Sequence, residues 1–150
     1  MGNLTSDRDT EFVDELHRDE APVAGGAKIC NGAAVALNAA GFAVSAGAGA
    51  KHFRGIADET ADNSGGQDGD ASVEIITPEA AFFDASGLTQ ADLGKHVYFS
   101  DDHTVTKTAG TNTYAGRIRE VTSATECLVD LRGAYVEPVV PTTAAPTTGA

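Results

Sequence analysis

Residues 32–45 read Gly32-Ala-Ala-Val-Ala-Leu37, then Asn38-Ala-Ala-Gly41, then Phe42-Ala-Val-Ser45, and these short apolar runs around a tight turn decide the fold. After a link of small residues the pattern closes with Phe53-Arg-Gly-Ile-Ala-Asp-Glu59. Such a pattern predicts a strand, a turn, a strand, a loop and a third strand, which is a β-meander. One meander is too small to bury its own apolar face, so a second unit must pack against it.

The same outline returns in the second half of the chain, with one shift of a single residue near its end. The corresponding segments are Gly94-Lys-His-Val-Tyr-Phe99, Ser100-Asp-Asp-His103, Thr104-Val-Thr-Lys107 and Tyr114-Ala-Gly-Arg-Ile-Arg-Glu120. The aligned pairs are Gly32 with Gly94, Val35 with Val97, Leu37 with Phe99, Phe53 with Tyr114, and Gly55 with Gly116. We therefore predict one all-β domain over residues 21–135, a small β-barrel or β-tulip built from repeat-like units at 28–60 and 94–131.

The rest of the chain predicts little regular structure besides this domain. Residues 1–20 are dominated by acidic side chains, and we expect a flexible arm with at most a short helix over residues 10–17. Residues 136–150 are rich in Pro and Thr and predict a disordered tail. Inside the domain, Thr89-Gln-Ala-Asp-Leu93 predicts a single helical turn that Gly94 stops.

Charge and composition exclude several classes of partner. The 150 residues carry 22 acidic against 10 basic side chains, a net charge of −12, which is the wrong sign for binding nucleic acid. No apolar run is long enough to span a bilayer and no secretory leader pattern is present, so we expect no membrane and synthesis in the cytoplasm. Cys30 and Cys127 lie in apolar runs far apart in sequence, and two buried free thiols are favoured over a disulfide.

The chemistry-bearing residues predict no catalytic, cofactor-binding or metal site. His17, His52, His96 and His103 have no ligand spacing, and the serines lack the context of a nucleophile. The acidic loop 58–70 crowds oxygen ligands between glycines but departs from the calcium-loop pattern. A solvated connection between strands is favoured there, with a weak calcium site as the alternative.

The run from Lys28 to Leu131 resembles the capsid decoration, or cement, proteins of tailed bacteriophages. The segments 35–45, 54–60, 71–77 and 82–83 resemble the hairpin and the following strands of the lambda-type head-stabilising protein. The segments 97–105 and 115–121 resemble the carboxy-terminal half of related small phage head proteins. The acidic arm and the Pro/Thr-rich tail depart from the lambda-type pattern.

The resemblance implies a non-enzymatic virion protein on the outer capsid surface. It implies a homotrimer that binds the major capsid protein of an expanded head, with the arm adding a strand to the shell, and we expect the domain itself to be stable without the arm. Two alternatives stay open. One is a fibre or adhesin domain, and the other is a trimeric β hydrolase that uses Asp58, Asp62 or Asp84 at a subunit boundary.

Overall fold

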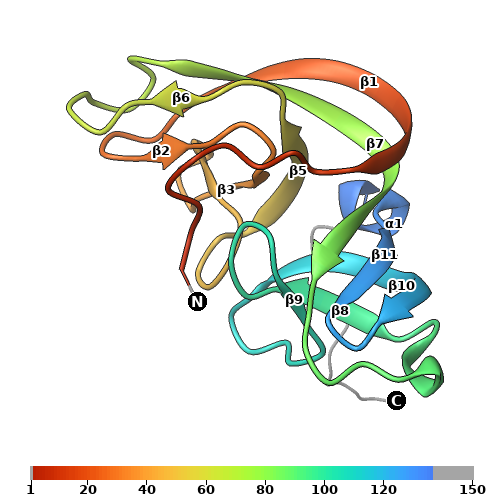
Figure 1. Ribbon diagram of the computed structural model, residues 1–150. Coiled ribbons are helices and arrows are strands. Elements are labelled where there is room, and N and C mark those ends of the chain that lie inside the picture. Colours follow the sequence, from red (N-terminus) through yellow and green to blue (C-terminus); the bar gives the residue numbers. More distant parts are fainter. Residues whose placement is uncertain (1, 137–150) are drawn as a thin grey trace.

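The computed structural model describes residues 2–136, with residues 12–16 described as backbone only, and it confirms the all-β prediction (Figure 1). Nearly all of the regular structure is antiparallel strand, and the strands are short except for three long ones. The long strands are β1 (Phe12–Pro22), β7 (Ser72–Asp84) and β10 (Thr113–Ser123). The shorter elements are β2 (Lys28–Ile29), β3 (Ala34–Leu37), β4 (Ala43–Ser45), β5 (His52–Ala57), β6 (Ala61–Asp62), the 3-10 turn η1 (Gln90–Asp92), β8 (His96–Phe99), β9 (Val105–Thr106), β11 (Glu126–Asp130) and α1 (Arg132–Val136).

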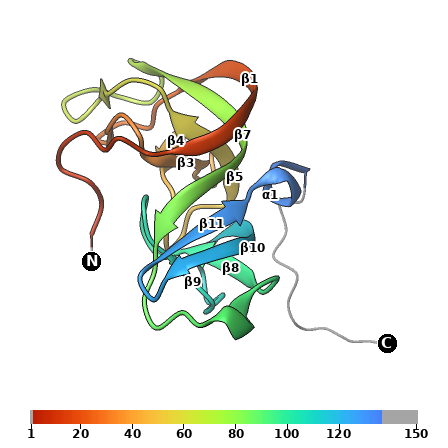
Figure 2. The ribbon, with the colours of Figure 1, turned by 45° about the vertical axis from the view of Figure 1, so that its right-hand side comes forward.

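The main sheet curls into a half-barrel whose two halves have the same internal order. Its path is β4-β3-β5-β7-β11-β10-β8-β9. In each predicted meander the third strand, β5 or β10, pairs with the first strand, β3 or β8, and not with the second, so the strand order of a true meander is wrong although both halves share the same order. The first unit then pairs with β7 through β5, and the second pairs with β11 through β10. The two halves join where β7 pairs antiparallel with β11 (Figure 2). From this junction outward, each half lists its strands in the same order, so the second half is the first reversed along the sheet. The internal repeat predicted from the sequence is therefore present in the strand pairing.

The repeat extends to a matching irregularity in β5 and β10. The register of β3 against β5 shifts between Gly55 and Phe53, and the register of β8 against β10 shifts between Gly116 and Tyr114. Both glycines have positive φ, at 144° and 129°. Each lies so close to a neighbouring backbone that a Cβ would stand 2.4 Å from the Ile76 carbonyl oxygen or 2.0 Å from that of Asp130. Glycine is required at this bulge because only a residue without a Cβ fits there.

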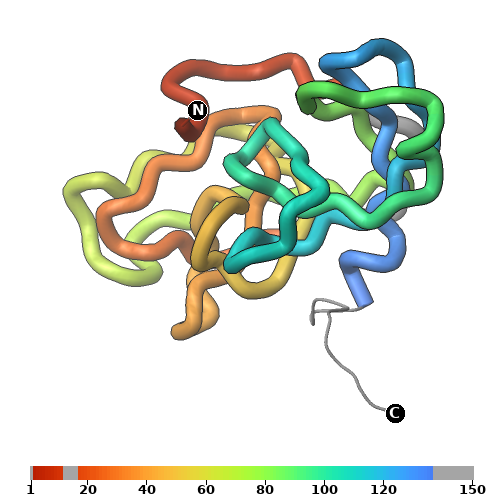
Figure 3. The backbone as a smooth tube through the Cα atoms, turned by 90° about the horizontal axis from the view of Figure 1, so that it is seen from below, coloured from red at the N-terminus to blue at the C-terminus, as the bar shows by residue number. Residues whose placement is uncertain are grey.

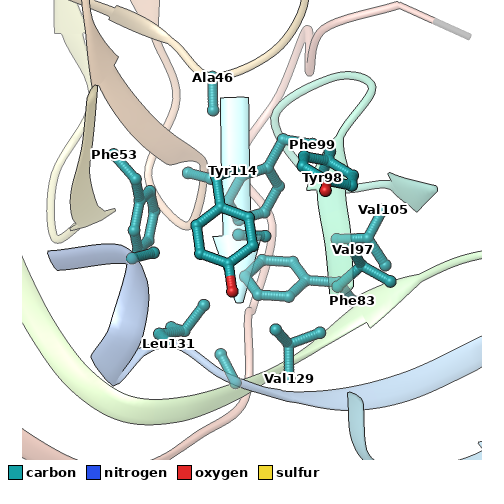
Figure 4. Close-up of a cluster of buried hydrophobic side chains, with 14 of the residues drawn as sticks. Ala46, Phe53, Phe83, Val97, Tyr98, Phe99, Val105, Tyr114, Val129 and Leu131 are labelled. Atoms are coloured by element: carbon teal, nitrogen blue, oxygen red, sulfur yellow. The ribbon is translucent and has the colours of Figure 1, made fainter. Parts of the chain in front are cut away.

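The main core lies between the two halves and is built around a group of aromatic rings (Figure 4). Phe99 contacts Phe53 at a ring-centroid distance of 5.1 Å and Phe83 at 5.0 Å. Phe53 comes from β5, Phe83 from β7 and Phe99 from β8, so the cluster joins both meanders. The halves are thereby packed into one domain, as the limited apolar area of each meander requires.

A smaller core lies under β7 and the strands of the first half, and the amino-terminal segment helps to cover it. Leu4 packs against this core, whose largest members are Val23, Ile29, Val35, Val73 and Ile75. The hydroxyl of Thr10 is buried and donates to the Gly32 carbonyl at 2.5 Å. The tube view shows this segment running along the body of the domain (Figure 3).

The prediction of a helix over residues 10–17 is wrong, and the domain does not begin at residue 21. Residues 12–22 form β1, which pairs antiparallel with β7 from Phe12 opposite Ala81 to Pro22 opposite Ser72. The physical reason is that so short a helix cannot offset its nucleation cost, whereas the long edge of β7 offers ladder hydrogen bonds. The segment predicted to be a flexible arm is therefore an integral strand over residues 12–20.

The carboxy-terminal end is described only as far as Val136. The helix α1 has 5 residues, and the sequence did not predict it. The tail predicted to be disordered, apart from Val136, lies outside the described residues. No helix within residues 2–136 has the length and apolar character needed to cross a membrane.

The predicted helical turn is confirmed at Gln90–Asp92, and the Asp92 carboxylate holds it. Asp92 accepts hydrogen bonds from Lys107 Nζ at 2.8 Å and from the Thr89 N–H at 3.0 Å, and Lys95 lies 3.3 Å away. The Lys107 hydrogen bond, followed by that of Thr89, lowers the pKa of Asp92 to about 2.

This shift predicts a loss of stability in acid. A carboxyl group whose pKa is lower in the folded state stabilises the fold above its unfolded pKa, and that contribution disappears as the pH falls through the folded value. We expect the thermal midpoint of the wild type to fall more steeply between about pH 4 and pH 2 than that of Asp92→Asn. Differential scanning calorimetry across this range checks it, and parallel slopes for the two proteins would contradict it.

Candidate functional site

The β8–β9 turn brings two buried carboxylates and a histidine together. Asp101 and Asp102 have side chains only 5% and 1% exposed, whereas His103 is 21% exposed. His103 Nδ1 lies 3.2 Å from Asp101 Oδ1 and 2.9 Å from Asp102 Oδ1. We call Asp101, Asp102 and His103 the acidic turn. Among the described side chains, those of residues 2–11 and 17–136, it is the one place where three ligating groups place donor atoms within 4.8 Å of one another.

The acidic turn is buried because three other parts of the chain enclose it. The Ala34 N–H of β3 donates to the Asp102 carbonyl at 2.8 Å, and the Asp84 N–H at the end of β7 donates to the His103 carbonyl at 3.0 Å. The backbone of Gly47 packs closely against Asp101. A Cβ at Gly47 would stand 3.3 Å from the Asp101 Cα, so a larger residue would have to displace the turn.

The amino-terminal segment closes the turn from another side. The Leu4 N–H donates to both oxygens of Asp102, at 3.1 and 3.3 Å. The Leu4 carbonyl in turn accepts a weak bond from Cys30 Sγ at 3.6 Å. Arg8 anchors the same segment, because its N–H donates to Asn31 and its guanidinium lies over the Phe83 ring at 6.0 Å.

The hydrogen bonding of the acidic turn is incomplete at one atom. Asp101 Oδ1 accepts from the His103 N–H at 3.1 Å, but the buried Asp101 Oδ2 has no hydrogen-bond partner among the described residues. Within the same residues no lysine or arginine forms an ion pair with Asp101 or Asp102. Two carboxylates are thus removed from water beside a single histidine, which is an electrostatically unfavourable arrangement without a further positive charge.

A second feature is the outer face of β1, β7 and β5, which carries crossed ion pairs. Arg18 of β1 pairs with Asp58 just after β5, and Arg54 of β5 pairs with Asp19 of β1 at 2.6 Å. The Arg54 hydrogen bond lowers the pKa of Asp19. Glu74 of β7 lies 4.0 Å from Arg18. These ion pairs connect β1 to β5 across β7.

The edge of β1 that faces away from β7 has no strand partner within residues 2–136. Ile76 is opposite Arg18 and also opposite Ile56, so β1 and β5 occupy opposite edges of β7. The Glu20 N–H is taken by the Asp19 carboxylate at 2.8 Å, which places this donor on the outer edge rather than in the ladder to β7. An edge covered in this way by charged side chains resists pairing with other copies.

A third feature is a groove of about 400 Å³ between β5 and α1. Phe53 and Tyr135 form part of its wall, and their rings stack at 5.3 Å. His17 and His52 both line it, so the fold brings these sequence-distant histidines to one place. Burial, followed by the charge of Arg54, lowers the pKa of His52.

His96, the two cysteines and Asp84 do not belong to the acidic turn or line the groove. His96 Nδ1 lies 2.7 Å from the Tyr114 hydroxyl. Cys30 and Cys127 are free and buried, which confirms the prediction, and burial raises the pKa of Cys127 to about 12. Asp84 lies at the end of β7, 3.6 Å from Arg8.

The acidic loop 58–70 uses its carboxylates to close itself. Asp62 accepts from the Ser64 N–H and hydroxyl, Asp70 accepts from the Gln67 N–H, and Asp68 accepts from the Gly25 N–H. Buried Asn63 adds bonds to carbonyls on both sides of the loop. These carboxylates do not converge on a common point, so the geometry lends no support to the calcium alternative.

The acidic turn was missed by reasoning from the sequence. Three consecutive ligating side chains were visible in the hairpin turn, but turns of this composition are usually exposed. Its burial depends on β3, β7 and Leu4, which lie far away along the chain.

Comparison of the chain with protein-family models, with curated proteins and with solved structures found no match.

Proposed function

We propose that this chain is a structural virion protein that binds the outer surface of an expanded tailed-phage head and cements neighbouring major-capsid subunits. The proposal begins from the resemblance of residues 28–131 to phage decoration proteins. The half-barrel supports it, because its two halves share one strand order, so the repeat on which that resemblance depends is present in the strand pairing.

The observation that carries the docking step is the outer edge of β1. A strand edge on the outside of a small domain can accept an added strand from a partner, which gives affinity through backbone hydrogen bonds without a deep pocket. The charged cover of this edge disfavours pairing with an identical acidic copy and favours a partner that supplies basic groups. A basic strand or loop of the major capsid protein fits these requirements.

The exposed surface bears on how the proposed trimer forms. Among the large hydrophobic side chains of the described residues, only Leu93 and Val136 are exposed, at 48% and 79%. Stable oligomers in solution normally bury a larger apolar patch. We therefore propose that three copies associate weakly in solution and form the trimer on the shell, where each bound copy raises the effective concentration of the next.

The proposal predicts binding to expanded heads that depends on β1 and on salt. The probe is undecorated expanded heads assembled from the major capsid protein encoded beside this chain's gene. We expect the wild type to cosediment with these heads and to bind less tightly as salt rises from about 50 to 500 mM, because exposed charges are screened. Glu20→Pro should bind at least about tenfold less, because proline lacks the outer-edge N–H that a partner strand would take over from the Asp19 carboxylate. The ladder to β7 should stay intact, since this N–H is not part of it.

Two controls separate docking from folding and from assembly. The free Glu20→Pro protein should unfold cooperatively in denaturant with a midpoint near that of the wild type. Analytical ultracentrifugation over a concentration series should show monomer with a minor trimer. Three results would each count against the virion role: no cosedimentation of the wild type, a stable dimer, or no capsid gene nearby. Binding of Glu20→Pro equal to that of the wild type would instead show that the docking surface is not β1.

A further inference from the structure

The acidic turn has the donor set of a divalent metal site, and nothing in the proposed capsid role accounts for it. Two carboxylates and one imidazole face one another, with His103 Nδ1 at 3.2 and 2.9 Å from the two Asp Oδ1 atoms. Donors that share one cation at about 2.1 Å stand about 3.0 to 3.4 Å apart in octahedral or tetrahedral geometry. The two distances from His103 Nδ1 therefore match the spacing of ligands around one ion, and all three donor atoms lie within 4.8 Å of one another.

The unpartnered oxygen of Asp101 is an independent indication of a missing positive partner. The Asp101 side chain is 95% buried, its Oδ1 accepts from the His103 N–H, and its Oδ2 has no hydrogen-bond partner among the described residues. A buried carboxylate oxygen without a partner is strongly unfavourable, so native proteins keep one chiefly where another group binds it. The charge count agrees, because one divalent cation neutralises the two negative charges of the carboxylates.

We propose that Asp101, Asp102 and His103 bind one first-row divalent cation of the Zn²⁺ or Mn²⁺ type. Imidazole nitrogen favours these metals over Ca²⁺ and Mg²⁺, which prefer all-oxygen sites. Deprotonated His103 Nδ1 supplies the nitrogen ligand, and Asp102 supplies one oxygen. Asp101 binds through both of its oxygens, so that the ion is also the partner that Oδ2 lacks. His103 is 21% exposed, so one ligand of the site is in contact with solvent.

The same site connects the amino-terminal segment to the second meander. The Leu4 N–H donates to both oxygens of Asp102. An ion that holds this carboxylate in place therefore also holds the two oxygens in position to accept from Leu4. Metal binding should thus hold residues 2–8 more firmly against the domain. This inference does not depend on the capsid role.

Calorimetric titration of the chelator-treated full-length protein with ZnCl₂ or MnCl₂ tests the proposal. We expect one ion per chain, and an unfolding midpoint raised by about 5 °C or more when the free metal exceeds its Kd a hundredfold. Asp101→Asn and His103→Gln should each weaken binding at least tenfold. Asp68→Asn, which neutralises an exposed carboxylate in the acidic loop, is the matched control and should bind as the wild type does.

The metal-free proteins distinguish a metal site from an internal ion pair. If Asp101 is a vacant ligand, Asp101→Asn without metal should keep or raise the unfolding midpoint, because it removes an uncompensated buried charge. A fall of several degrees without any metal response would identify a simple ion pair with protonated His103 and overturn the proposal. No binding at millimolar metal, or uptake that all three variants retain, would overturn it too. Hydrogen exchange at residues 2–8 should slow on metal addition only in proteins that bind the ion.

Discussion

Replacing Gly116 by alanine is expected to cost about 3 kcal/mol or more of folding free energy, a large share of the 5 to 15 kcal/mol typical of a domain. The added Cβ would stand 2.0 Å from the Asp130 carbonyl oxygen, at a residue whose φ is 129°. A side-chain rotation cannot relieve the clash, because the obstacle is the backbone of the neighbouring strand β11. It cannot relieve the positive φ either, because φ belongs to the backbone of residue 116. Gly55→Ala should behave alike, since its Cβ would meet the Ile76 carbonyl of β7.

Two further glycines make the prediction sharp. Gly94 also has positive φ, at 84°, but a Cβ there meets nothing within 4 Å, so Gly94→Ala should show the conformational cost alone, about 1 kcal/mol. Gly133 lies in α1 with neither problem, and Gly133→Ala should be neutral or raise stability by up to about 1 kcal/mol. Urea denaturation of the four variants gives this order. A Gly116→Ala protein as stable as Gly94→Ala would contradict the close approach of the strands.

The sequence made the repeat predictable because its local signals are strong. Gly55 and Gly116 recur at matching points, and apolar residues such as Val35 and Val97 lie at the same position in each first strand. The hairpins β3–β4 and β8–β9 follow from local order, because short turns pair neighbouring strands. The single turn at Gln90–Asp92 was predictable for the same reason. The return of β5 beside β3, and of β10 beside β8, was not predictable in this way.

What the sequence did not reveal depends on contacts between distant residues. The backbone of residues 12–22 finds its partner in β7, some sixty positions later, and a short apolar pattern does not distinguish a helix from a strand. The acidic turn reads as an exposed hairpin loop until β3, Leu4 and Asp84 are placed around it. In both cases the local pattern is ambiguous and the tertiary partner decides.

Deleting residues 1–20 is expected to abolish cooperative folding or to remove most of the stability of the domain, contrary to the expectation from the sequence. The deletion removes nearly all of β1 and so exposes one edge of β7 from Glu74 to Ala81. Each ladder hydrogen bond contributes about 1 kcal/mol net, so losing the strand approaches the total stability of a small domain. The deletion also uncovers the smaller core beneath Leu4.

A shorter deletion separates the strand from the segment that precedes it. Removing residues 1–11 keeps β1 but loses the contacts of Leu4 and Thr10, and we expect a cooperative transition with a clearly lower midpoint. A synthetic peptide of residues 1–22 added to the 1–20 deletion should restore part of the lost circular dichroism signal, because the edge of β7 is then paired again. If the 1–20 deletion unfolds at the wild-type denaturant midpoint, β1 is not an integral strand in solution. In that case, a loss of capsid binding after the 1–20 deletion would measure docking directly. If β1 is an integral strand, the deletion unfolds the protein, and Glu20→Pro is then the variant that measures docking alone.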